Sequence, residues 1–231
     1  MEDCAAAPPK PRERIVSTAR DLFRKHGIRG IGVDAIAELA GTNKMTLYRH
    51  FGSKDDLVVA CLREVAREVE AMWDGFDAAH PDDPLAQLHA WVRCGAECAG
   101  GDGRGCDMAN AAVELAESDH PARGFIEQFK SAQRDRLARL CRKAGIAKAD
   151  LLADALSLLL EGARVSRQSA GVEGPCARFI AIGEAVIAAF ASGAKGRKQP
   201  RYRRRAAGPA KVPRLAARAS SRGGAALKGA R

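Results

Sequence analysis

Two short segments with helical periodicity, joined through a glycine, span residues 32–51 and constrain the fold of this chain most strongly. In the first segment apolar residues recur at helical spacing until Gly41 interrupts the pattern. Asn43 can cap the second segment by accepting a backbone N–H, and Leu47 with Phe51 supplies its buried face. The pattern predicts a helix-turn-helix whose second helix, about nine residues long, can enter a major groove.

Helical patterns flank this segment on both sides. Upstream, apolar residues at helical spacing over Arg12–His26 are interspersed with basic side chains, and Gly27 follows as a stop. Downstream, Ser53 is a second N-cap candidate, and the acidic Asp55 and Asp56 suit the positive end of a helix. We expect a three-helix head and a fourth helix that leaves it for the rest of the chain.

The outward faces of the second helix carry side chains that suit DNA. They are Lys44, Met45, Thr46, Tyr48, Arg49 and His50, with Lys54 at the start of the next helix. Lys44 and Arg49 can donate to guanine O6 and N7, and Thr46 can contact a base edge or a thymine methyl. Tyr48, His50 and the lysine of the next helix better suit phosphate. An ordinary surface helix gives the same short pattern, so the prediction of DNA binding depends on the ordered set of three helices.

The sequence AGTNKMTLYRHFGSKDDL, residues 40–57, resembles the signature of the tetracycline-repressor (TetR) family of one-component regulators. The resemblance extends from Arg12 to about Leu62. It implies base contacts from the positions of Lys44, Met45, Thr46 and Arg49. It implies phosphate contacts from the positions of Tyr48, His50 and Lys54.

Two positions depart from the family pattern. The family usually has Ser or Thr where this chain has Gly32, and often a small residue where it has Met45. Glycine can cap a helix but has no hydroxyl to donate. The departures put a phosphate contact at Gly32 in doubt and indicate an apolar contact from Met45, to a thymine methyl for example.

Beyond the head, the chain shows further helical periodicity and no convincing strand alternation. Aromatic residues make up only 5% of the chain, and Ala, Leu, Arg and Glu are abundant, which favours helices. The expected helical segments are Pro84–Cys98, Met108–Glu117, His120–Lys143, Asp150–Ser169 and Ala177–Phe190, with a glycine-rich loop at Ala99–Gly105. The sequence thus predicts an all-α protein.

We divide the chain into four parts: a flexible arm (1–9), a helix-turn-helix DNA-binding domain (10–70), a larger helical domain (71–192) and a basic tail (193–231). The tail holds 13 Lys and Arg and no Asp or Glu, with few large apolar residues, so we expect it to be disordered when free. The preceding residues hold 25 basic and 28 acidic groups. The net charge of +10 therefore belongs to the tail and is not by itself a sign of a DNA-binding head.

The larger domain contains two stretches, GCDMANAAVELAESDHPAR and LLLEGARVSRQSAG, that resemble the C-terminal domain of one branch of the same family. The resemblance implies a helical domain for ligand binding and homodimerisation, whose last two helices pair with those of a second subunit. Apolar stripes fit this role, although such stripes are more often plain intramolecular core. They comprise Leu152, Leu156, Leu159, Leu160 and Ala163 on one helix and Phe179, Ile180, Ile182, Val186, Ile187 and Phe190 on the other. We favour the dimer because two recognition helices about one DNA turn apart are how such small motifs obtain adequate affinity.

Aromatic and polar residues of the larger domain are candidates for an apolar ligand pocket with a few polar groups. The candidates are Trp73, Trp91, Met108, Asn110, Glu114, Phe125 and Phe129, with Phe76 and His89 beside them in the pattern. The alternative is that most of them are plain core. The ligand expected is a small-molecule effector of unknown identity.

The chain has seven cysteines, an odd number without a CxxC pair, which indicates a reduced, intracellular protein. Cys94 and Cys98 share a helical face, and Cys106 follows across the glycine-rich loop, so a thiol redox switch or a soft-metal site is conceivable. The alternative is that they act as small hydrophobes, and the spacing matches no established zinc pattern. We therefore expect no metal.

Several function classes lack their signatures in this sequence. Nucleophile elbows, HExxH and phosphate-binding glycine loops are missing, so we expect neither an enzyme nor a cofactor. No N-terminal stretch resembles a signal peptide, and the most apolar segments are short and carry Asp154 and Glu184, which favours a cytoplasmic protein without membrane contact.

Our leading hypothesis is a dimeric repressor on double-stranded operator DNA, released when an effector shifts the fourth helix. One alternative is an architectural DNA-binding protein driven by the basic tail. Others are a thiol- or metal-responsive sensor using Cys94, Cys98 and Cys106, and an enzyme or ligand carrier with an incidental head.

Overall fold

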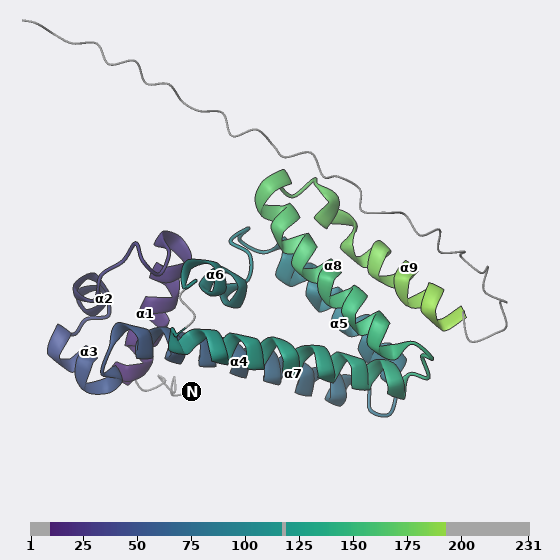
Figure 1. Cartoon of the computed structure of the whole chain (residues 1–231), viewed down its shortest axis with the longest axis horizontal. Helices are drawn as coiled ribbons and strands as arrows, with labels where there is room; N and C mark the ends of the chain where they lie inside the picture. The colour runs from purple at the N-terminus through teal and green to yellow at the C-terminus, as the bar shows by residue number, and fades with distance from the viewer. Residues whose placement is uncertain (1–9, 117–118, 193–231) are drawn as a thin grey trace, which may run out of the picture. The chain divides into compact units, whose positions relative to one another are not determined.

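Helices are the regular elements of the parts of the chain that the structure describes, residues 10–116 and 119–192 of a computed structural model (Figure 1). In chain order they are α1 (Pro11–His26), α2 (Val33–Leu39), α3 (Lys44–Phe51), α4 (Lys54–Ala79), α5 (Pro84–Gly100), α6 (Asp107–Glu114), α7 (Pro121–Lys143), α8 (Ala149–Ala170), the 3₁₀ helix η1 (Pro175–Arg178) and α9 (Phe179–Ser192). The predicted all-α fold class is confirmed. The predicted arm and basic tail lie outside the described residues.

Caps and glycine turns set the boundaries of α2, α3 and α4 as the sequence predicts. The Asn43 side chain accepts a hydrogen bond from the Thr46 amide at 2.9 Å, and the Ser53 hydroxyl accepts one from the Asp56 amide at 3.0 Å. Between α2 and α3 the chain reverses at Gly41, whose φ of +63° lies in the left-handed region that favours glycine. The helix-turn-helix therefore follows from local chemistry.

The head is formed by α1, α2, α3 and the first turns of α4. Its apolar core includes Ile15, Ala19, Leu22, Ile36, Leu47, Phe51, Leu57 and Cys61. Polar contacts brace the same elements from outside, since the Arg20 guanidinium of α1 donates to both carboxylate oxygens of Glu68 on α4, at 2.5 and 2.8 Å. Such bidentate pairs add geometric specificity, so α1 and α4 hold each other in register.

Helix α4 belongs to both the head and the larger domain. Leu57 and Cys61 lie in the core of the head, whereas Trp73, further along the same helix, lies in the core of the larger domain. A separate apolar cluster around Val58 and Leu62 joins α4 to α6 and α7. The predicted division at residue 70 thus falls inside a continuous helix, and it stays a prediction.

The larger domain packs α5 against α7, α8 and α9, while α7 also packs along α4 (Figure 1). Ion pairs tie these helices together: the Arg134 guanidinium of α7 lies 2.7 Å from Asp154 on α8, and the Arg136 guanidinium lies 2.6 Å from Glu70 on α4. The carboxylates raise the pKa of Arg134, through its hydrogen bond to Asp154 above all. These contacts fix α7 between its two neighbours.

Three expected boundaries differ from the structure. Helix α5 continues to Gly100, past the expected start of the loop at Ala99. Helix α6 ends at Glu114, because Leu115 leaves the helical conformation and its side chain turns into an apolar cluster. The last expected helix is preceded by a 3₁₀ turn, η1, that begins at a proline and passes directly into α9.

The apolar stripe predicted on α8 for subunit pairing is largely intramolecular. Leu152, Leu156 and Ala163 are buried against α5 and α7 within one chain. A different row on the same helix is exposed: Leu151, Leu158 and Val165, seven residues apart. The prediction selected the wrong face because both faces of α8 are apolar, and spacing alone does not tell which one meets the core.

One stretch of the described residues, Pro175–Ser192, is long and apolar enough to cross a membrane by length and composition, with a mean hydropathy of 1.4. The core helix of a soluble protein passes the same test, so a single such stretch is weak support for a membrane span. Its exposed side chains include Ile180 and Ile182.

Candidate nucleic-acid interface and internal cavity

Helix α3 presents a polar and basic outer face on a buried apolar base. Leu47 is fully buried and Phe51 nearly so, which turns Lys44, Tyr48 and Arg49 to the outside. Met45 is 79% exposed, a large value for a thioether side chain. Of the residues predicted to face DNA, Lys44, Met45, Tyr48, Arg49 and His50 are exposed and Thr46 is half-buried.

Helix α1 braces the helix-turn-helix from behind. The Arg12 guanidinium lies over the Phe51 ring, 5.2 Å from its centroid, and the Arg14 Nε donates to the Ala40 carbonyl at 3.3 Å. A cation over an aromatic face is attracted by the ring quadrupole. Both ends of the two-helix unit are therefore fastened to α1, and α3 sits on a rigid support.

The ammonium of Lys44 has a partner that sequence reasoning missed. It donates to the Asp34 carboxylate in the first turn of α2 at 3.0 Å, and this hydrogen bond raises the pKa of Lys44. Asp34 is exposed beside the predicted base-contacting face, where a carboxylate repels phosphate. Ten positions separate the pair, and only the turn at Gly41 brings them together.

Lys54 is held more tightly than the sequence predicts. It lies at the start of α4, where its ammonium donates to the Ile31 carbonyl at 2.6 Å, in the connection before α2. Partial burial lowers the pKa of Lys54. The side chain thus anchors the start of the helix-turn-helix, in addition to the phosphate contact predicted for it.

The larger domain contains a cavity of about 340 Å³ between α4, α5, α6, α7 and α8, and the cavity is open to solvent at Cys98. This volume falls in the range of small-molecule sites. Three of the predicted ligand residues, Trp91, Met108 and Phe129, line it. Further apolar lining that the sequence did not single out comes from Val65, Val69, Met72, Leu137 and Leu160, and charged lining comes from Lys130, Arg134, Glu161 and Arg164.

Other predicted ligand residues lie outside this cavity. The Trp73 indole is packed in the core and donates to the Gln133 side chain at 2.6 Å, with the Phe76 ring against it at right angles. Phe125 packs on the cluster around Leu62 instead. His89 approaches Glu184 on α9 at 3.8 Å. These residues support the walls, because a helix with apolar side chains on several faces points only some of them inward.

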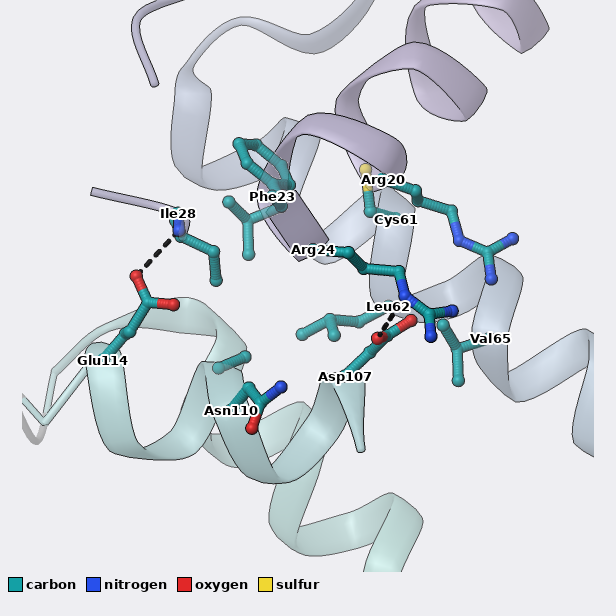
Figure 2. Close-up of a pocket in the computed structure, with 12 residues that line it drawn as sticks. Arg20, Phe23, Arg24, Ile28, Cys61, Leu62, Val65, Asp107, Asn110 and Glu114 are labelled. Carbon is teal, nitrogen blue, oxygen red and sulfur yellow. Dashed lines mark hydrogen bonds and ion pairs between the residues drawn. The ribbon is translucent and has the colours of Figure 1, made fainter. Parts of the chain in front are cut away.

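Asn110 and Glu114 line a second, much smaller pocket of about 40 Å³ at the junction of α1, α4 and α6 (Figure 2). The Glu114 carboxylate accepts hydrogen bonds from the backbone amides of Ile28 at 2.7 Å and Arg29 at 3.2 Å. Asn110 donates to the Arg104 carbonyl at 2.6 Å. Both side chains thus make hydrogen bonds within the protein, and their predicted role in ligand binding stays a prediction.

The same junction carries several charges. Asp107 at the start of α6 lies 3.6 Å from the Arg24 Nε on α1, and burial raises the pKa of Asp107 (Figure 2). Asp102, in the loop before α6, lies 2.8 Å from another Arg24 nitrogen. Ion pairs therefore join α6 and its preceding loop to the C-terminal end of α1. Sequence reasoning missed this junction because 86 positions separate Ile28 from Glu114.

Three cysteines from two neighbouring segments line the larger cavity. Cys94 and Cys98 come from α5 and Cys106 from the loop before α6, so the structure brings together the three that the sequence singled out. The Lys130 ammonium lies 3.6 Å from the Cys106 sulfur. Within the described residues, no group of three or more His, Cys, Asp or Glu side chains is arranged to hold a metal ion.

The head of this chain is similar in sequence to known bacterial regulators. Residues 15–61 match the family model of bacterial regulatory proteins, tetR family. The HTH-type transcriptional regulator RutR of Escherichia coli K12 is 34% identical over 84 residues, 36% of this chain and 38% of RutR. The HTH-type regulatory protein RaaS of Mycobacterium tuberculosis is 43% identical over 58 residues, 25% of this chain and 27% of RaaS. The chain thus covers between about a quarter and two fifths of the length of these curated relatives.

Solved structures extend the likeness to the larger domain. A TetR-family transcriptional regulator from Streptomyces coelicolor is 26% identical, with a TM-score of 0.70 over 78% of this chain and 95% of that protein. A TetR-type regulator from Streptomyces avermitilis is 27% identical, with a TM-score of 0.63 over 79% and 99%. The head thus matches the tetR family model, and the fold of the chain is shared with these TetR-family regulators.

Proposed function

We propose that this protein is a dimeric transcriptional repressor in the cytoplasm, which leaves its operator when a small molecule enters the larger cavity. The observation that carries the proposal is the exposed face of α3 on a rigid support, within the segment that matches the family model. Regulators of this kind act by binding DNA, and the proposal includes no catalytic role.

For the DNA complex, we assign base contacts to Lys44, Met45, Thr46 and Arg49 and phosphate contacts to Tyr48, His50 and Lys54. The exposure of the α3 side chains supports this assignment. Lys44 must exchange Asp34 for a base or phosphate when DNA binds, since the two are paired in the free protein. Lys54 keeps its place at the Ile31 carbonyl, which positions its ammonium at the start of α4.

For the dimer, we assign the interface to α8 and α9. Its supporting observation is the exposed apolar row of Leu151, Leu158 and Val165 on α8, continued by Ile180 and Ile182 on α9. Apolar rows of this kind are costly to leave in water and suit a bundle formed with a second copy. Two heads would then reach half-sites about one helical turn apart, ~34 Å.

Two helices connect the cavity with the head. Helix α4 supplies Val65 and Val69 to the cavity wall and Leu57 to the core of the head. Helix α6 supplies Met108 to the wall and, through Glu114, holds the connection after α1. A ligand that displaces either helix changes the position of the head, and by thermodynamic linkage operator DNA must weaken that ligand equally.

The test is operator binding by the full chain on DNA from upstream of its own gene and the adjacent one. We expect footprinting to show a protected inverted repeat, and Arg49→Ala to weaken binding at least tenfold, as expected for loss of a good base contact. Arg139→Ala is the charge-matched control, because Arg139 is exposed on α7. Equal affinity for all DNA fragments would overturn a sequence-specific repressor.

A second experiment compares the full chain with a chain that lacks the basic tail. A chain ending at residue 192 should keep the footprint if α3 reads the operator. The slope of log affinity against log salt should become shallower if the 13 basic residues of the tail contact phosphate. Loss of the footprint together with the tail would favour an architectural DNA-binding protein instead.

A further inference from the structure

We propose that the larger cavity captures small electrophiles covalently, with Cys98 as the attacking thiol and Cys94 beside it on the same face of α5. The ligand class is an apolar α,β-unsaturated carbonyl compound. The chemistry stands independently of the function proposed above, and the regulatory consequence rests on that function.

The geometry pairs the two thiols. Cys94 and Cys98 lie one turn apart on the face of α5 that lines the cavity. The Arg164 guanidinium of α8 lines the same cavity, and the Cys98 side chain is exposed to solvent. A thiol beside a cation is stabilised as the thiolate and is nucleophilic where solvent and ligands reach it.

The pKa of Cys98 differs from that of the structural cysteines. Donation from Cys94, then the charge of Arg164, lowers the pKa of Cys98 to about 6, while the same pairing raises the pKa of Cys94. Burial instead raises the pKa of Cys61 to about 12 and that of Cys141 to about 11. At neutral pH Cys98 is thus mainly thiolate, the nucleophilic form, and the two buried thiols are inert.

The walls of the cavity indicate which electrophile fits. Most of the lining is apolar, with Met72, Trp91 and Leu137 contributing large surfaces, so the ligand needs a hydrocarbon body. The cations Lys130 and Arg164 also line the cavity, so the ligand can present a carbonyl oxygen to them. A hydroperoxide needs no apolar cavity, whereas a conjugated enone combines an apolar body, an acceptor oxygen and a soft electrophilic carbon.

The addition balances without a further reactant. The sulfur lone pair of Cys98 forms the new C–S bond at the β-carbon, and the alkene π pair moves toward the carbonyl oxygen as an enolate. The α-carbon then takes one proton from water. No group leaves and nothing is oxidised or reduced, and a nearby cation stabilises the developing oxyanion.

The position of Cys98 connects the adduct to the head. Cys98 lies in the last turn of α5, four residues before Asp102, which pairs with Arg24 of α1 at 2.8 Å. Arg104 in the same loop donates to the Arg24 carbonyl at 2.7 Å. An adduct at Cys98 displaces this loop, and the displacement weakens the contacts of Asp102 and Arg104 with Arg24 of α1.

The first experiment measures alkylation of the full chain at pH 7 with limiting N-ethylmaleimide and, separately, 2-cyclohexen-1-one. We expect intact mass to show one fast adduct and peptide mapping to place it on Cys98. Cys98→Ser should slow the reaction at least tenfold, while Cys176→Ser, a half-buried cysteine outside this cavity, should not change it. A fast adduct mapped to any other cysteine overturns the proposal.

The pH profile tests the pairing. Because only the thiolate reacts, the rate should fall by half as the pH drops to about 6 and reach its plateau by about 8. Cys94→Ala removes the donating thiol and should move the midpoint to higher pH, with unfolding temperature as the check that the variant folds. A rate that still rises steeply above pH 8, as for an ordinary thiol, contradicts the proposal.

Operator affinity distinguishes failure of the thiol chemistry from failure of the proposed repressor function. We expect the wild-type adduct to bind the footprinted operator at least tenfold more weakly, and Cys98→Ser to bind normally with or without the electrophile. An adduct that leaves operator affinity unchanged removes the regulatory role. If the unmodified chain binds no operator at all, the proposed function fails, while the mass and pH measurements still decide the chemistry.

Discussion

The DNA-facing surface and the cavity are built in opposite ways. All seven side chains that we assign to DNA fall within residues 44–54, on α3 and the first residue of α4. The side chains that line the cavity come from five helices and the loop before α6, at positions between Val65 and Arg164. A surface on one helix needs only the period of that helix, whereas a cavity needs several helices to be placed correctly at once.

The two regions also use charge differently. On α3 the cations are exposed, and Lys44 is paired with a carboxylate that is more exposed still. Inside the cavity, Lys130 pairs with Glu161 at 2.5 Å, and hydrogen bonding from Cys94 and the charge of Arg164 lower the pKa of Cys98. Exposed charges are screened and exchange partners readily, while partly buried ones act on their neighbours strongly. The first arrangement suits contact with DNA, and the second suits a change in thiol reactivity.

The largest effect we predict breaks the head and spares the cavity. Leu47→Ala removes a fully buried side chain from the head core and should lower the free energy of unfolding by about 2–5 kcal/mol. Thermal unfolding and operator binding measure the loss, and alkylation at Cys98 shows whether the cavity persists. Val113→Ala, at a side chain of α6 that is 79% exposed, is the control. Equal destabilisation by both substitutions would contradict the described packing.

The junction between the two regions gives the next effect. Glu114→Ala removes the acceptor of the Ile28 and Arg29 amides and should cost about 1–3 kcal/mol, because the Ile28 amide lies in a nearly buried turn. Hydrogen exchange at these two amides should accelerate. Glu127→Ala, an exposed position on α7, should change neither quantity. Unchanged exchange in Glu114→Ala would show that the junction does not hold the head.

A smaller change sharpens the description of the DNA-facing surface. Asp34→Asn removes the carboxylate that pairs with Lys44 and should strengthen operator binding about two- to fivefold, with a steeper salt dependence. Asp21→Asn, on an exposed part of α1, controls for the overall charge. Weaker binding by Asp34→Asn alone would mean that the carboxylate itself contacts the operator.

The smallest predicted effect concerns the departure at Gly32. Its φ of −88° suits any residue, and an added side chain would meet no atom within 4 Å. Gly32→Ser supplies a capping hydroxyl and should stabilise the protein by a few tenths of a kcal/mol, with slightly tighter operator binding. Gly32→Ala, which lacks the hydroxyl, is the matched control. Equal behaviour of the two variants would mean that the hydroxyl makes no contact.

Most of the head could be predicted because its determinants are neighbours in the sequence. Asn43 and Ser53 cap the helices that follow them, and Gly41 turns the chain. Two contacts of the head could not be predicted: the pair of Lys44 with Asp34, and the hydrogen bond of Lys54 to the Ile31 carbonyl. Both depend on how α2 and the preceding connection fold back on α3 and α4. Spacing identifies which side chains are outward, and tertiary contacts decide what they touch.

Periodicity and capping were thus enough to establish a helical chain with a helix-turn-helix head, because hydrogen bonds between near neighbours define helices. Packing between distant segments decided three other features. They are the apolar face of α8 that joins the core, the aromatic residues that line the cavity, and the contact of Glu114 with the head. The same is true of the thiols. Their spacing puts Cys94 and Cys98 on one face, but only Arg164, brought in from α8, completes the surroundings that distinguish Cys98 from the other cysteines.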